Sequence, residues 1–118
     1  MKRLMFIVGI ILLLANFAIA LTSIEAAAVD AEGKGILSTI SVTATPGEGD
    51  IFVSITPLTG IDTQHSEKIA VSVAASIAGV DAKKFNLLFK IESSAEVVDG
   101  PSAGAALTLL SYGELTGK

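Results

Sequence analysis

The alternation of apolar and polar residues from position 36 onward predicts two β-strands joined by a turn. Residues 36–45 alternate with a period of two and are rich in β-branched side chains, a pattern typical of a half-buried strand. The segment PGEGD at 46–50 contains the residues that favour turns. Residues 51–56, IFVSIT, predict a second strand. We therefore expect residues 36–56 to form a β-hairpin.

The segment from Asp62 to Gly79 has helical periodicity. The side-chain oxygen of Asp62 or Thr63 is expected to cap its N-terminus, and Gly79 is a typical helix end. Alanines beside the apolar residues permit close packing against a sheet. The predicted buried stripe consists of apolar residues spaced by four: Ile69, Val73 and Ile77.

The remaining pattern predicts a third strand at 86–91, a loop at 92–100 and a second helix that begins at Pro101 and ends near Gly113 or Gly117. Strands and helices are thus interleaved in the order β-hairpin, helix, strand, helix. This order predicts an α/β (α+β) fold of two layers over residues 36–118.

The N-terminus has a different pattern. Lys2 and Arg3 precede an 18-residue apolar run, residues 4–21. Ala18-Ile19-Ala20 fits a signal-peptide cleavage site, whereas the length of the run is borderline for a membrane anchor. Residues 1–24 are therefore interpreted as a signal peptide or an N-terminal anchor. Residues 25–35 are interpreted as a linker. Both interpretations place the following domain on the extracytoplasmic side, secreted or attached to the membrane through residues 4–21.

Composition removes several classes of function. The chain of 118 residues contains no cysteine, which excludes disulfides, thiolate metal sites and cysteine nucleophiles. Without Lys2 and Arg3, six basic and twelve acidic residues remain, a net charge of −6. An acidic domain without a basic patch argues against nucleic-acid binding. We predict neither a metal site nor a cofactor.

One short stretch carries candidate chemistry. In DGPSAG, residues 99–104, Ser102 lies between a predicted loop and a predicted helix. Unpaired amides at a helix start can stabilise an oxyanion or hold a phosphate, and the small residues around Ser102 leave the backbone accessible. The alternative is structural, because a serine near a helix start is a common N-terminal cap.

DGPSAG resembles the serine motif of Lon-type peptidases, which have the same six residues around the nucleophile. The order of elements upstream of the motif is also similar, and the resemblance covers roughly residues 31–118. It implies a Lon proteolytic domain of the ribosomal protein S5 domain 2-like type, from the archaeal secreted or membrane-anchored branch. No GxxxxGK[ST] motif is present, so this chain has no ATPase of its own.

The resemblance also implies roles for the residues of the motif. Ser102 matches the nucleophile of a serine endopeptidase that forms an acyl-enzyme with its polypeptide substrate. Asp99 matches an acidic residue that we interpret as orienting the loop or the catalytic pair. The turn and oxyanion scaffold is the rest of the motif: Gly100, Pro101, Ala103 and Gly104. The family also implies a ring-like homo-oligomer.

The general base is missing from this pattern. The family uses a lysine several tens of residues after the serine, but only sixteen residues follow Ser102. Lys118 would lie at the far end of the helix, Lys90 is expected on a solvated sheet face, and His65 is expected on the surface of the first helix. We therefore expect an N-terminal fragment that neither folds stably nor hydrolyses peptides alone. We also expect the second helix to expose leucines: Leu107, Leu109, Leu110 and Leu115.

Two other functions fit the same residues. A phosphate-binding domain of the small-molecule kinase type also uses a glycine-serine turn at a helix start. A non-catalytic binding or structural module would use Ser102 only as a cap. ATP binding and labelling by a serine-reactive probe distinguish these alternatives from the peptidase.

Overall fold

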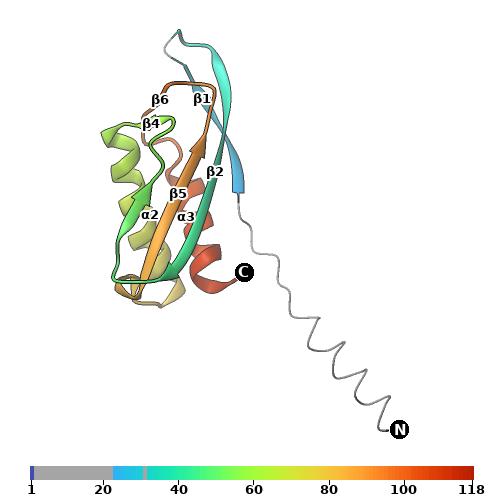
Figure 1. Cartoon of the computed structure of the whole chain (residues 1–118), viewed down its shortest axis with the longest axis vertical. Helices are drawn as coiled ribbons and strands as arrows, with labels where there is room; N and C mark the ends of the chain where they lie inside the picture. Colours follow the sequence, from blue (N-terminus) through green and yellow to red (C-terminus); the bar gives the residue numbers. More distant parts are fainter. Residues whose placement is uncertain (2–22, 31) are drawn as a thin grey trace.

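The computed structural model describes Met1, residues 23–30 and residues 32–118. Two helices cover one face of a four-stranded mixed sheet, so the fold is a two-layer α+β arrangement (Figure 1). Residues 2–22 of the segment predicted as a signal peptide or anchor, residues 1–24, lie outside the described residues, whereas Ser23 and Ile24 belong to the first strand. The elements are β1 (Ser23–Val29), β2 (Gly35–Pro46), β3 (Ile51–Val53), β4 (Leu58–Thr59), α2 (Ile61–Ala78), the 3-10 turn η1 (Ala82–Lys84), β5 (Phe85–Glu92), β6 (Val97–Val98) and α3 (Gly104–Thr116).

The order of strands in the main sheet is β1-β2-β5-β3. The predicted strands at 36–45 and 86–91 are present as β2 and β5, which pair antiparallel with Val42 opposite Phe89. Alternate residues of both strands point toward the helices and are buried, as the period of two predicts. They form the sheet side of the core: Ile40, Val42, Leu87, Phe89 and Ile91.

The predicted hairpin of residues 36–56 is wrong. β3 is only three residues long and pairs in parallel with β5, which lies between β2 and β3. The turn at 46–50 is held open by Asn86, whose side-chain Oδ1 accepts hydrogen bonds from the amides of Glu48 and Asp50. Bonds from the turn to β5 thus replace the bonds that a hairpin would make between its own strands.

Residues 25–35, interpreted as a linker, contain most of a strand. β1 pairs antiparallel with β2 along its whole length, from Ser23 opposite Ser41 to Val29 opposite Gly35. The connecting turn is closed by Asp30, whose Oδ1 accepts from the amides of Glu32 and Lys34. The sequence of β1, SIEAAAV, contains three alanines, and alanine has a low preference for strands. Pairing with the longer β2 supplies the stability that this sequence lacks.

Helix α2 occupies the predicted segment but presents a different face. Gly79 ends it in a left-handed conformation, φ 68°, as predicted. The predicted stripe is wrong, because Ile69, Val73 and Ile77 are 63%, 41% and 67% exposed. The buried face carries smaller or polar side chains, which bring α2 close to its neighbours: Thr63, Ser66, Glu67, Ala70, Val71, Ala74 and Ala75.

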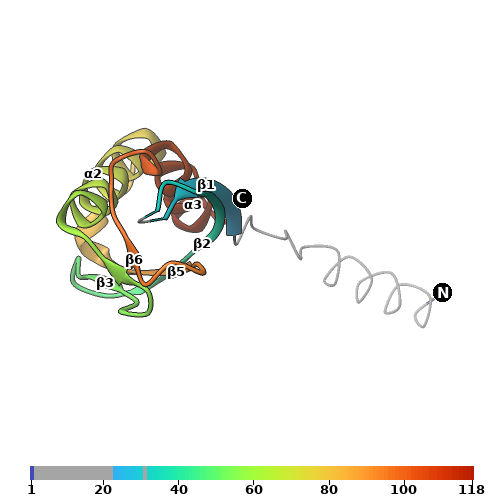
Figure 2. The same cartoon turned by 90° about the horizontal axis from the view of Figure 1, so that it is seen from above.

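Helix α3 lies beside α2 on the same side of the sheet, as Figure 2 shows from above. It begins at Gly104, three residues after Pro101. The prediction that Pro101 lies in the first turn of this helix is therefore wrong. Leu107, Leu110 and Leu115 are buried between α2 and the sheet, contrary to the expected exposure. Leu109 alone of the four leucines is exposed, at 54%. The described elements therefore enclose a core of their own.

Candidate functional site

Ser102 lies in a sharp turn between β6 and α3. The turn begins at Gly100, whose φ of 119° lies in the region that favours glycine. The residue at the N-cap of α3 is Ala103, and no side chain caps this helix. The Ser102 side chain is exposed, and its hydroxyl makes no hydrogen bond to any described residue. Ser102 therefore does not cap α3, as the alternative interpretation of this residue required.

The first turn of α3 has amides available for a ligand. The amide of Gly104 donates to the Pro101 carbonyl at 3.1 Å, and the amide of Leu107 donates to the Ala103 carbonyl at 2.9 Å. No described group outside the helix accepts from the amides of Ala103, Ala105 and Ala106. Such amides carry the positive end of the helix dipole. They follow Ser102 by one to four positions in the chain, and amides at a helix start are groups that can form an oxyanion hole.

Asp99 caps the other helix. Its Oδ1 accepts hydrogen bonds from the amides of Asp62 and Thr63 at 3.1 and 3.2 Å, and from the amide of Gly100 at 2.9 Å. The predicted cap of α2 by Asp62 or Thr63 is therefore wrong, since the cap comes from a residue 36 positions away in the sequence. Asp99 links the serine turn to the start of α2. This contact is compatible with the predicted orientation of the loop.

A cleft of about 270 Å³ opens beside Ser102. Small and apolar residues of β1, β2 and β6 line it together with Asp99 and Ser102: Ala27, Ala28, Val29, Ile36 and Val98. β1 is an edge strand of the sheet. One side of its backbone therefore has no strand beside it among the described residues. The fold brings Asp99 and Ser102 together with residues 27–29 of β1 around this cleft.

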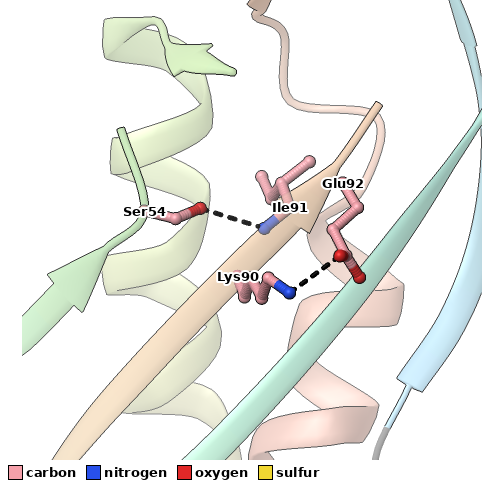
Figure 3. Close-up of polar contacts among 4 residues, drawn as sticks. All are labelled: Ser54, Lys90, Ile91 and Glu92. Carbon is pink, nitrogen blue, oxygen red and sulfur yellow. Dashed lines mark hydrogen bonds and ion pairs between the residues drawn. The ribbon is translucent and has the colours of Figure 1, made fainter. Parts of the chain in front are cut away.

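The candidate bases lie elsewhere. Figure 3 shows Lys90 in an ion pair with Glu92, at 2.7 Å between Nζ and Oε1, on exposed side chains of β5. The same view shows the Ile91 amide donating to Ser54 Oγ at 3.2 Å. His65 is exposed on α2, and Lys118 follows the far end of α3, about 20 Å away at 1.5 Å per residue. No lysine or histidine lines the cleft among the described residues.

Glu67 is a buried acidic residue within the core face of α2. Its side chain is fully buried on α2, one turn after Thr63, and neither carboxyl oxygen has a partner among the described residues. Burial raises the pKa of Glu67 from 4.5 to about 7. Two buried hydroxyls, of Ser38 and Ser111, also lack partners. The pattern of α2 did not indicate Glu67, because its buried stripe was assigned to the wrong face.

Several residues that contact the serine turn or line the cleft are not indicated by the sequence pattern. Gly60 and Thr63, at the start of α2, lie directly against Asp99. Ala27, Ala28 and Val29 form one wall of the cleft. Gly60 and Thr63 belong to the segment TGIDT, residues 59–63, which is typical of a helix start. This segment does not indicate that Asp99 is the residue in contact with it. The wall fell within the segment interpreted as a linker.

Within the part of the chain that the structure describes, no helix combines the length and apolarity needed to cross a membrane. The apolar run at 4–21 lies outside that part. No family model matches the chain, and a search of curated proteins found no match.

Proposed function

We propose that this chain provides the nucleophile region of a Lon-like serine endopeptidase. The observation that carries the proposal is the exposed side chain of Ser102, which caps no helix, has no hydrogen-bond partner among the described residues, lines a cleft and directly precedes α3 in the chain. A serine placed so is available to react. The DGPSAG sequence, identical to the family's serine motif, supports the same reading.

The chemistry follows from this arrangement. The Ser102 oxygen attacks the carbonyl carbon of a peptide bond, and a base takes the hydroxyl proton. Negative charge develops on the carbonyl oxygen, where amides at the start of α3 stabilise it. The carbon–nitrogen bond then breaks, and the amine leaves with the proton. The resulting ester between Ser102 and the acyl group is hydrolysed by water. A neutral lysine is the base expected from the family.

The cleft suggests how a polypeptide substrate would lie. An extended peptide adds to a sheet edge through backbone hydrogen bonds; β1 is an edge strand, and its residues 27–29 line the cleft that contains Ser102. Ala27 and Ala28 leave room for substrate side chains. The proposal requires a base from outside the residues that line this cleft, because none of them is a lysine or histidine.

The phosphate-binding alternative is less well supported. Its ligand would carry two or more negative charges, yet the cleft contains the Asp99 carboxylate and no described cationic side chain. The non-catalytic alternative, in which Ser102 acts as a cap, lacks the capping hydrogen bond. A homo-oligomer and attachment to the membrane through residues 4–21 remain part of the proposal through the family resemblance alone.

A fluorophosphonate probe tests the proposal on the full chain. The serine oxygen attacks phosphorus, the phosphorus–fluorine bond breaks, and fluoride leaves while the hydroxyl proton passes to a base. We expect mass spectrometry to map the label to Ser102, and added propylamine to accelerate labelling by replacing the lysine. Ser102→Ala should abolish the label, whereas Ser94→Ala, at an exposed loop serine, should retain it. Equal labelling of wild type and Ser102→Ala would refute the proposal.

A further inference from the structure

The segment that leads into the serine turn is attached to the start of α2 instead of to the main sheet. β6 pairs in parallel with β4, with Leu58 opposite Val97 and Thr59 opposite Val98. The amide of Gly60 continues this ladder by donating to the Val98 carbonyl at 2.9 Å. The backbone before Ser102 therefore has its position set by residues 58–63.

The bonds of Asp99 extend the same attachment. One carboxyl oxygen accepts from two amides of α2 and from the amide of Gly100, so it joins the helix start to the turn. The buried hydroxyl of Thr63 adds long contacts to the carbonyls of Gly100, at 3.4 Å, and Val98, at 3.5 Å. Hydrogen bonds to a charged acceptor are the strongest of these. The Asp99 carboxylate is thus the main link.

Gly60 makes room for this link. A Cβ atom built on Gly60 would overlap the side-chain carboxyl carbon and both carboxyl oxygens of Asp99. The backbone of Gly60 is extended, φ −72° and ψ 172°, so any residue could adopt its conformation. The requirement for glycine at this position therefore comes from the approach of Asp99 and not from the backbone.

We infer that Gly60 is a positioning residue for Ser102. The missing side chain lets Asp99 lie on the amide groups of α2, and that contact holds the turn at the angle that presents Ser102 beside the amides of α3. The catalytic consequence rests on the proposed function, whereas the link between Gly60, Asp99 and the turn does not. A shift of about 1 Å at a nucleophile can lower a rate by roughly a hundredfold.

A double-mutant cycle on the full chain tests the inference. Gly60→Ala should make the amides of Asp62 and Thr63 exchange about tenfold faster with deuterium, because they lose a charged acceptor. It should also slow phosphonylation of Ser102 about tenfold or more. In the Asp99→Ala background the same substitution should change neither rate, because the carboxylate that it displaces is gone.

Gly35→Ala is the matched control, since a Cβ at Gly35 meets nothing within 4 Å. It should leave both rates unchanged. Equal effects of Gly60→Ala in the wild-type and Asp99→Ala backgrounds would overturn the inference, as would unchanged exchange at Asp62 and Thr63. If the wild type does not label at Ser102, the peptidase proposal fails, and the exchange cycle still decides whether Gly60 and Asp99 are coupled.

Discussion

The buried carboxyl of Glu67 should make the stability of this protein fall as the pH rises. The side chain is 0% exposed and has no hydrogen-bond partner among the described residues, so the folded state disfavours its charged form. Its pKa is raised from 4.5 to about 7 on folding. Below pH 4.5 the group is protonated in both the folded and the unfolded chain, and its ionisation has no effect on stability.

Between pH 4.5 and pH 7 the unfolded chain releases this proton while the folded chain keeps it. The free energy of unfolding therefore decreases over this range and levels off above it. At 1.36 kcal/mol for each pKa unit, the shift corresponds to about 3 kcal/mol. This is a large part of the stability of a small domain, which is on the order of 5–15 kcal/mol.

Glu67→Gln removes the ionisation with almost no change in shape. We expect the variant to match the wild type near pH 4.5 and to be more stable by about 3 kcal/mol at pH 8. Urea unfolding followed by far-ultraviolet circular dichroism at several pH values measures the difference. Glu48→Gln, at an exposed position in the 46–50 turn, is the matched control and should give a curve parallel to the wild type.

A carbon-13 titration of the Glu67 side-chain carboxyl gives the pKa directly. Parallel stability curves for wild type and Glu67→Gln from pH 4.5 to 8 would refute the reasoning. So would a midpoint of the titration near 4.5.

Three further predictions concern the core and the helix ends. Leu107→Ala should destabilise the chain by about 2–5 kcal/mol, because it opens a cavity at a fully buried position. Leu109→Ala, at an exposed position, should cost less than about 1 kcal/mol. Urea unfolding compares the two variants, and equal losses of stability would contradict the packing of α3. Ser111→Ala should stabilise the chain by about 1 kcal/mol in the same assay, because it removes a buried hydroxyl that has no described partner; a loss of stability would mean that the hydroxyl has a partner. Gly79→Ala should lower the melting temperature through about 1 kcal/mol of strain, since Gly79 has φ 68°, and an unchanged melting temperature would contradict the left-handed end of α2.

The position of the candidate site in the sequence was predictable because its parts are local. Ser102, the glycines around it and the helix start after it are neighbours in the chain, and DGPSAG indicates a turn at a helix N-terminus on its own. The supporting contacts were not predictable, because they join residues more than thirty positions apart. Asp99 caps α2 across 36 positions, and Gly60 matters only because Asp99 lies against it.

The sequence by itself determined the strands β2 and β5, the helices and the end of α2 at Gly79, since periodicity and glycine conformation act over a few residues. The tertiary structure decided which strands pair and which helix faces are buried. β5 lies between β2 and β3 and pairs with both, and Asn86 at its start accepts hydrogen bonds from the turn before β3, a contact across almost forty positions. The apolar stripe of α2 is exposed because α3 packs on another face of the helix, where small side chains allow a close approach. On α2 that face carries alanines, Thr63 and Glu67, whose carboxyl has no partner among the described residues.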